Sequence, residues 1–234
     1  PYGRRRVTYA DYTASGRALA FIEDFVRDQV LPSYANTHTE SSGTGLQTTR
    51  LREEAREIIR DAVHGDDDTV VLFAGSGSTG AIAKLIGVLG LRIPSVLDDA
   101  LALSEHIAPD QRPVVFIGPY EHHSNEIPWR ESIADVVTIR QDIDGGVDLE
   151  DLREQLEKHA ERPLKIGSFS AASNVTGIVS DTYGIAELLH AHGALSFWDF
   201  AAAAPYVDVT MPAVEGRPLS YKDAVFISPH KSIG

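Results

Sequence analysis

Residues 165–199 have the sequence KIGSFSAASNVTGIVSDTYGIAELLHAHGALSFWD, and this stretch decides the fold of the chain. Residues 165–170 and 194–198 are short segments that we interpret as strands, and residues 182–192 between them repeat apolar side chains at helical spacing. A strand, a helix and a second strand in this order form the unit from which parallel sheets are built. We therefore predict an α/β fold with a mainly parallel sheet covered by helices on both faces.

The same alternation continues on both sides of this unit. Apolar residues recur at helical spacing over residues 19–30 and 51–62, which predicts two helices before the first buried strand. The other predicted strands are residues 69–73, 114–117, 135–139 and 223–227, and the other predicted helices are residues 79–89 and 149–159, the second capped by Asp148. We expect one domain over residues 1–234, with a helical N-terminal segment over about residues 1–65 and irregular stretches around residues 43–45 and 94–113.

The composition limits the class of protein. With 234 residues, of which 43% are hydrophobic and 24% charged, the chain can bury a sizeable core. A net charge of -13 disfavours nucleic acids and anionic membranes as partners, because residues 4–6 (RRR) are only a short basic run. The sequence has no cysteine, which excludes disulfides and thiol nucleophiles within this span. No membrane-length apolar window or signal-peptide core is present, so we expect a cytoplasmic protein.

Ligands of parallel sheets bind beyond the carboxyl ends of the strands, so the residues that follow each predicted strand are the candidates for a site. Residues 75–80 (GSGSTG) lie between a predicted strand and a helix, where small residues let backbone N–H groups close on a phosphate. The same residues fit the G-x-G-x-x-G pattern of a dinucleotide site, with Asp98 and Asp99 as candidate ribose contacts. A purely structural glycine-rich turn is a third interpretation.

Four more strand ends carry polar side chains. They are residues 121–125 with the pair His122 and His123, residues 173–177 with Asn174, the strand end at Asp199, and residues 228–232 with Lys231. Each has a simpler explanation alone: exposed histidines, an Asx turn, or a surface lysine. A metal site from His122, His123, Asp199 and His230 has acceptable ligand types but no characteristic spacing. Together, however, a phosphate cup, an imidazole, an amide, a carboxylate and a lysine indicate one site.

Several of these segments resemble motifs of one known family. The resemblance covers nearly the whole chain and rests on residues 9–15 (YADYTAS), 52–56 (REEAR), 144–149 (DGGVDL), 173–177 (SNVTG), 190–194 (HAHGA) and 228–231 (SPHK), of which the last is the most specific. On these residues the chain is similar to the class V aminotransferase and cysteine desulfurase group of fold-type I enzymes that depend on pyridoxal 5′-phosphate (PLP). The resemblance implies the large PLP-binding domain, without the small C-terminal domain, and a homodimer that acts on a small amino acid.

The resemblance also implies roles for individual residues. Lys231 would be the lysine that forms a Schiff base with PLP, His122 would stack on the pyridine ring, and Asp199 would pair with the pyridinium nitrogen. The other residues expected to bind the cofactor are Ser78, Thr79, Ser228 and His230 at the phosphate, and Asn174 at the ring hydroxyl or the substrate. No metal is expected.

The reaction stays open at this point. Cysteine desulfurases usually carry a glutamine three residues after the aspartate, whereas this chain has Ala202 there. We therefore leave transamination, desulfuration or β-elimination, and racemisation as candidate reactions. The alternatives from other classes are an NAD-dependent oxidoreductase built on residues 75–80, a metallohydrolase, and a noncatalytic binding module that keeps the fold.

Overall fold

The computed structural model describes residues 3–37, 39 and 41–233. Its centre is a parallel sheet of five strands in the order β2-β1-β3-β4-β5. The strands are β1 (Val114–Ile117), β2 (Asp135–Thr138), β3 (Lys165–Ser170), β4 (Leu195–Asp199) and β5 (Ala224–Phe226). The predicted parallel α/β fold is confirmed, and each of these strands begins and ends within one residue of its predicted bounds.

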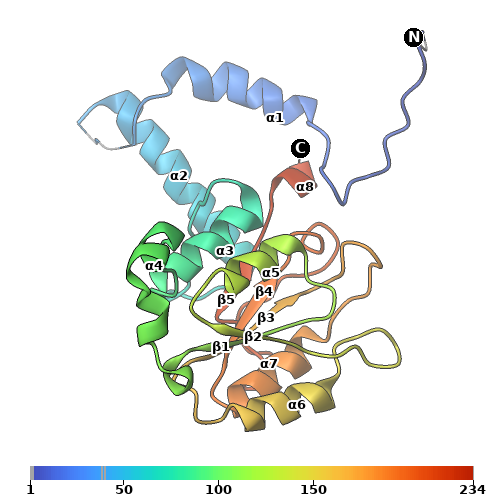
Figure 1. The fold of residues 1–234 in the computed structure, drawn as a ribbon. Helices are drawn as coiled ribbons and strands as arrows, with labels where there is room; N and C mark the ends of the chain where they lie inside the picture. The colour runs from blue at the N-terminus through green and yellow to red at the C-terminus, as the bar shows by residue number, and fades with distance from the viewer. Residues whose placement is uncertain (1–2, 38, 40, 234) are drawn as a thin grey trace.

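Helices cover both faces of the sheet. Figure 1 shows α6 (Leu149–Lys158) and α7 (Thr182–Ala191) on one face, and α3 (Gly77–Val88) and α5 (His123–Arg130) on the other. Successive side chains of a strand point to opposite faces, and β1 follows this rule, since Val114 and Phe116 pack in one cluster and Val115 and Ile117 in the other. A strand buried on both faces must be apolar throughout, which explains the continuous run VVFI.

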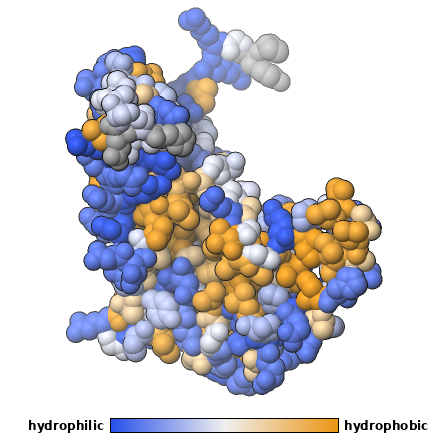
Figure 2. All heavy atoms as spheres, turned by 90° about the vertical axis from the view of Figure 1, so that its left-hand side faces the viewer, coloured by the Kyte–Doolittle hydropathy of each residue, from blue (hydrophilic) through white to orange (hydrophobic). Residues whose placement is uncertain are grey.

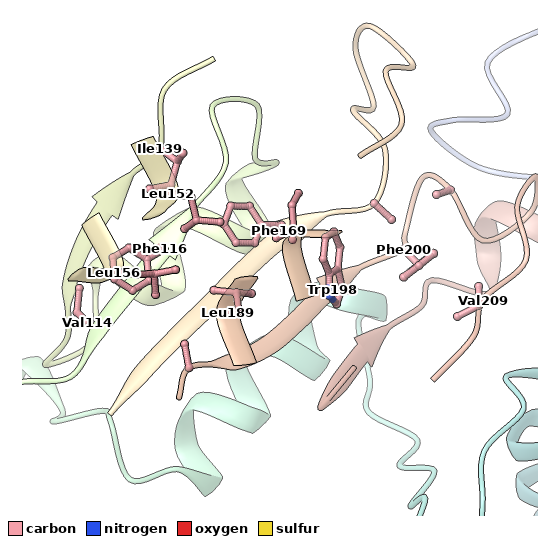
Figure 3. Packing of buried hydrophobic residues seen from close by; sticks show 14 of the residues in the cluster. Val114, Phe116, Ile139, Leu152, Leu156, Phe169, Leu189, Trp198, Phe200 and Val209 are labelled. Carbon is pink, nitrogen blue, oxygen red and sulfur yellow. The ribbon is translucent and has the colours of Figure 1, made fainter. Parts of the chain in front are cut away.

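The cluster beneath α6 and α7 contains the larger aromatic core. Phe169 and Trp198, on neighbouring strands, lie with ring centroids 6.0 Å apart, and Leu152 and Leu189 reach them from the two helices (Figure 3). Burying one such side chain contributes roughly 1.5–3 kcal/mol to folding. The indole N–H of Trp198 donates to the Ser196 hydroxyl at 2.7 Å, so the ring is buried without an unpaired donor.

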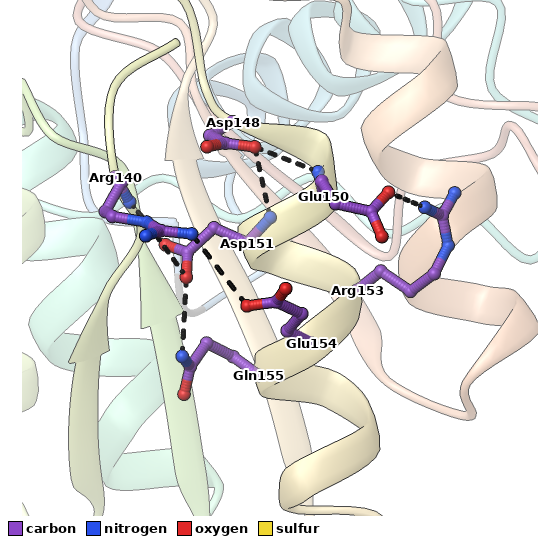
Figure 4. A network of polar contacts seen from close by, with 7 residues as sticks. All are labelled: Arg140, Asp148, Glu150, Asp151, Arg153, Glu154 and Gln155. Atoms are coloured by element: carbon purple, nitrogen blue, oxygen red, sulfur yellow. Dashed lines mark hydrogen bonds and ion pairs between the residues drawn. The ribbon is translucent and has the colours of Figure 1, made fainter.

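The start of α6 is fixed by carboxylates. The Asp148 side chain accepts hydrogen bonds from the backbone N–H groups of Glu150 and Asp151, which confirms the predicted cap. The buried Asp151 in turn accepts a hydrogen bond from the backbone N–H of Arg140 at 2.7 Å, and the Arg140 side chain bridges to Asp151 and Glu154 (Figure 4). These contacts tie the helix to the segment that leaves β2.

The N-terminal helices form an arm that projects from the body (Figure 1). It consists of α1 (Ala20–Phe25), which continues through a π-helical turn (Val26–Val30) and a 3-10 turn (Leu31–Ser33), and α2 (Gly43–Ala62). The two predicted helices are therefore confirmed. The prediction that residues 43–45 are irregular is wrong, because the Ser42 hydroxyl accepts the Gly45 N–H at 3.1 Å and starts α2 there.

The prediction of a buried strand at residues 69–73 is also wrong. This segment pairs with no strand among the described residues, and Val70, Leu72 and Phe73 are 75%, 61% and 48% exposed. Its β-branched, apolar composition is typical of a strand, but a strand needs a hydrogen-bonded neighbour, and none of the described segments pairs with it as a strand. Figure 2 shows apolar residues gathered on the face of the body next to the arm.

Two further segments are more helical than predicted. Residues 94–113, predicted as irregular, contain α4 (Ser95–Leu101) and two 3-10 turns (Leu103–His106 and Pro109–Gln111). The chain after β5 turns directly into α8 (His230–Ile233). In these places short helical turns satisfy backbone groups without the long apolar repeat by which a helix is recognised in a sequence.

A protonated histidine is indicated at the end of α7. The Nδ1 atom of His190 lies 2.7 Å from the Leu219 carbonyl oxygen, and its Nε2 atom lies 2.9 Å from the Asp223 carboxylate. Since both neighbours are acceptors, the doubly protonated ring satisfies both. Burial alone would lower the pKa of His190, but the Asp223 carboxylate and the Leu219 carbonyl offset this, and the pKa is raised above its ordinary value of 6.5.

We expect this pair to make stability depend on pH. Because the pKa of His190 is higher in the folded state, its stabilisation is complete below the unfolded value and is lost as pH rises through the folded value. In urea unfolding of the full-length protein, His190→Gln should therefore cost more stability at about pH 6 than at about pH 9. His192→Gln, at a ring with one carbonyl contact, is the matched control. A cost of His190→Gln that is the same at both pH values would contradict this.

Candidate active site

A cavity of about 550 Å³ lies at the carboxyl ends of β3 and β4, a volume within the range of small-molecule sites. The structure brings all eight residues proposed from the sequence to this one cavity: Ser78, Thr79, His122, Asn174, Asp199, Ser228, His230 and Lys231. They come from five segments that are far apart in the chain. Parallel strands place their carboxyl ends at one edge of the sheet, which is why these segments meet.

A pair of serines links the start of α3 to the end of β5. The Ser228 hydroxyl accepts the backbone N–H of Ser78 at 3.0 Å and donates to the Ser78 hydroxyl at 3.1 Å. This approach requires a glycine at position 77, which has φ +61°, and where a Cβ would stand 2.8 Å from the Ser228 oxygen. Backbone N–H groups at a helix start, with hydroxyls around them, form a cup suited to an anion such as phosphate.

The two histidines play different parts. His122 lines the cavity as the N-cap of α5, and its Nδ1 atom accepts the backbone N–H of Ser124 at 3.1 Å. The neutral ring therefore carries its proton on Nε2. The Ser124 hydroxyl lies 2.9 Å from Nδ1 and 2.7 Å from the Thr79 hydroxyl, which connects the imidazole to α3. His123 begins α5 and does not line the cavity.

A carboxylate and an amine face the same cavity. Asp199 ends β4 and is 5% exposed, and its Oδ1 atom accepts the backbone N–H of Ala201 at 2.8 Å. Burial raises the pKa of Asp199, while the contacts with Ala201 and Ser78 and the positive charge of Lys231 oppose the rise. A cation brought against this carboxylate would supply the partner that a buried charge requires. Lys231 lies in α8, whose start is fixed by a 3.0 Å hydrogen bond from its backbone N–H to the Ser228 carbonyl.

The N-terminal segment closes one side of the cavity. Asp11, Thr13 and Ala14 line it, and the backbone N–H of Gly16 donates to the His230 carbonyl at 2.7 Å. Sequence reasoning did not predict these lining residues, because only their similarity to a family motif was visible. The segment has no apolar periodicity that could place it over the sheet.

Other lining residues were also missed. They are Ser76, Ser124, Ser170, Ala172 and Ala201. Ala202, which stands where cysteine desulfurases usually carry a glutamine, also lines the cavity. Ser170 could have been found, since it is the last residue of β3 and follows the same strand-end rule as Asp199. Ser124 lies within residues 121–125, which the same rule singled out, but its contacts depend on the rotamer of His122 and on the position of α3.

The alternative sites gain nothing from the structure. Residues 75–80 do not follow a strand, and the Asp98 carboxylate caps a local turn by accepting the Ser104 N–H at 2.7 Å. Within residues 3–37, 39 and 41–233, no three His, Asp or Glu side chains gather as a metal site would require. Over the same residues, no helix is long and apolar enough to cross a membrane.

The fold and the cavity define an α/β protein with a candidate ligand site at the carboxyl ends of its strands. The family model described as Aminotransferase class-V matches residues 8–234, and the chain belongs to this family, whose members depend on PLP. It is 27% identical over 207 residues to a probable cysteine desulfurase of Halalkalibacterium halodurans, a match that covers 87% of this chain and 46% of that protein. The chain spans about half the length of the curated relatives it matches.

Solved structures agree on the fold. A NifS-like protein from Rickettsia africae superposes with a TM-score of 0.71 at 19% identity, covering 94% of this chain and 53% of that one. The apo structure of a cysteine desulfurase from Thermococcus onnurineus gives a TM-score of 0.71 at 20% identity, covering 95% and 49%. At these identities the likeness shows the fold alone. None of the proteins compared supports the dinucleotide alternative.

The residues present fit PLP. The serine cup, closed by the glycine at position 77, offers N–H and hydroxyl donors of the kind a phosphate takes. The buried Asp199 carboxylate needs a cation, which a protonated pyridine nitrogen would provide. Lys231 supplies an amine and His122 a flat ring in the same cavity. Donors for the phosphate, a partner for the nitrogen and an amine for the aldehyde are therefore all present.

We expect Gly77→Ala to damage this cup. The left-handed backbone costs a non-glycine residue about 1 kcal/mol or more, and the new methyl group would press on Ser228. Urea unfolding of the full-length protein should show that loss, together with weaker PLP binding. Gly87→Ala, in the same helix with open space around it, should instead stabilise by about 0.5–1 kcal/mol. Equal effects of the two substitutions would count against this account of the cup.

Proposed function

We propose that the full-length protein is a PLP-dependent enzyme that acts on a small amino acid, with Lys231 as the residue bonded to the cofactor. The observation that carries the proposal is the convergence of Lys231, Asp199 and His122 with the Ser78–Ser228 cup in one cavity of about 550 Å³. An amine, a carboxylate, an imidazole and an anion cup in one place match the functional groups of PLP one by one. A noncatalytic module would not need the amine.

The roles follow from the chemistry of each side chain. PLP, when bound, supplies an electron sink that stabilises negative charge at the substrate α-carbon. Asp199 would keep a proton on the ring nitrogen by pairing with it, and the low exposure of this carboxylate strengthens that pairing. His122, held by Ser124, would fix the plane of the ring. The Lys231 amine would hold the cofactor at its aldehyde group and would move the α-proton of the substrate.

The remaining residues would bind and orient. Ser78, Thr79, Ser228 and His230 would hold the phosphate, and Asn174 would contact the ring hydroxyl or the substrate. We propose cysteine as the first amino acid to test, because the named relatives are probable cysteine desulfurases. These 234 residues contain no cysteine, so a thiol that receives sulfur would lie outside them.

The proposal predicts a covalent adduct on one lysine. After the full-length protein is incubated with PLP and reduced with borohydride, peptide mass spectrometry should find the pyridoxyl group on Lys231. Lys231→Ala should lose the adduct and turnover together. Lys222→Ala is the matched control: burial lowers the pKa of Lys222 to about 8, which makes its amine reactive, but it lies outside the cavity and donates to the Thr210 carbonyl.

Two results would refute the assignment. One is a folded wild-type protein that takes up no PLP after this treatment. The other is an adduct found on Lys222 instead of Lys231, since Lys222 is also a buried, reactive amine but lies outside the cavity.

If the adduct is found on Lys231, screening amino acids against the PLP-loaded enzyme would separate transamination, desulfuration and racemisation by their products.

We also propose that the full-length protein is a homodimer. The arm leaves large apolar side chains in water, among them Phe21, Leu31 and Ile58 at 70%, 60% and 68% exposure, and apolar surface of this kind favours association. Light scattering should give twice the mass of one chain, and Ile58→Glu should lower it. Ile143→Glu, at a fully exposed residue away from the arm, should leave the mass unchanged. A wild-type protein with the mass of one chain would contradict the proposal.

A further inference from the structure

Glu121 is an acidic residue beside the cavity for which the roles proposed above have no use. It lies between β1 and α5, directly before His122, and does not itself line the cavity. Ser170, which it contacts, does line the cavity. In the sheet, Ser170 is the register partner of Asp199, so the contact brings Glu121 to the centre of the candidate site.

Four donors converge on the Glu121 carboxylate. Its Oε1 atom accepts the backbone N–H groups of Ser170 at 2.9 Å and Gly118 at 3.2 Å. Its Oε2 atom accepts the Ser170 hydroxyl and the Asn125 side-chain amide, each at 2.7 Å. A Cβ at Gly118 would stand 2.6 Å from Oε1, so a glycine is required for the carboxylate to fit. These bonds fasten the turn before His122 to the end of β3.

Asn125 can only donate to Glu121. It is fully buried, and its Oδ1 atom accepts the Ser168 hydroxyl at 2.6 Å. Its Nδ2 atom also donates to the Ser168 carbonyl at 3.2 Å. Turning the amide over would set its oxygen against that carbonyl and against the Glu121 carboxylate. The orientation of Asn125 is therefore fixed. An NH2 group in place of the Glu121 Oε2 atom would meet the Asn125 donor, whereas a protonated Oε2 atom keeps a lone pair that can accept from Asn125.

The charge of Glu121 is balanced between two states. Burial raises its pKa to about 7, the hydrogen bonds from Asn125 and Ser170 oppose that rise, and the negative charge of Asp199 adds to it. Asp199, on β4, is the charged group that acts on Glu121. His122, the next residue, turns its Nδ1 atom to Ser124, and the partners from α5, β3 and the end of β1 are neutral.

We propose that Glu121 is a positioning residue that sets the hydrogen-bonding direction of the Ser170 hydroxyl in the cavity wall. This inference rests on the proposed function. When Glu121 is ionised, the Ser170 hydroxyl donates to it and only oxygen lone pairs face the ligand. When Glu121 takes a proton from solvent, that proton can be donated to the Ser170 oxygen, and the serine proton becomes free to turn toward the ligand. Glu121 thereby decides whether the site offers an acceptor or a donor.

The test compares PLP dissociation constants of full-length wild type and Glu121→Gln across pH. Glutamine, like the protonated acid, is uncharged and can donate to the Ser170 oxygen. The variant should therefore bind PLP about tenfold more weakly than wild type above pH 7, where Glu121 of wild type is ionised. Below pH 7, the ratio of the two dissociation constants should fall toward one. When Ser170 is replaced by alanine, the effect of Glu121→Gln on the PLP dissociation constant should no longer depend on pH. The double variant with both substitutions should bind PLP no more weakly than the weaker-binding of the two single variants. Glu126→Gln, at the exposed ion pair with Arg130 on the same helix, should match wild type.

Several outcomes would overturn the inference. One is a ratio of PLP dissociation constants, Glu121→Gln to wild type, that does not change with pH, which a merely structural role would produce. Another is a double variant whose fold loss of PLP affinity equals the product of the fold losses of the two single variants. If Glu121→Gln does not fold, Ser170→Ala, which keeps the carboxylate, decides by itself: PLP affinity with the wild-type pH profile overturns the inference. If the wild-type protein forms no pyridoxyl adduct on Lys231, the proposed function is refuted as well. If the adduct forms on Lys231 but Glu121→Gln binds PLP like wild type at every pH, this inference alone is refuted.

Discussion

The parallel pairing of β3 and β4 is the constraint on which the rest of the site depends. Its register sets Ser170 opposite Asp199, so that the two strand ends present their last polar residues together. Any slip of one residue would turn these side chains to the opposite face and bury the wrong set in the core. The two apolar clusters on either side of the sheet hold the register, because each strand is buried on both faces.

Around this pairing, the end of the sheet is unusually polar for a buried region. Ser168, Asn125 and Asp199 are all nearly or fully buried, and each has a hydrogen-bond partner. Such groups contribute little net stability, but leaving one unpaired would be costly, so each fixes the orientation of its neighbour. The geometry of the cavity is therefore set as much by the satisfaction of buried polar groups as by apolar packing.

Much of this arrangement could be predicted from the sequence. The apolar run at residues 114–117 and the strand pattern at residues 165–170 located β1 and β3, and the strand-end rule pointed to Asp199 and Lys231. The run at residues 69–73 misled because composition records the tendency to form a strand and not the presence of a neighbour. The Glu121 network escaped prediction because its four bonds join residues up to 49 positions apart through side-chain rotamers.

The hydrogen bond from Gly16 to His230 has a consequence for the order in which the protein assembles. It joins residues 214 positions apart, so the wall of the cavity near Asp11 cannot gain this bond until His230 has been synthesised. Contacts of such sequence separation carry a large loop-closure cost and tend to form late in folding. During translation, the Gly16 N–H therefore gains this partner only after the strands of the sheet have been made, and this side of the cavity is completed after the sheet around β3.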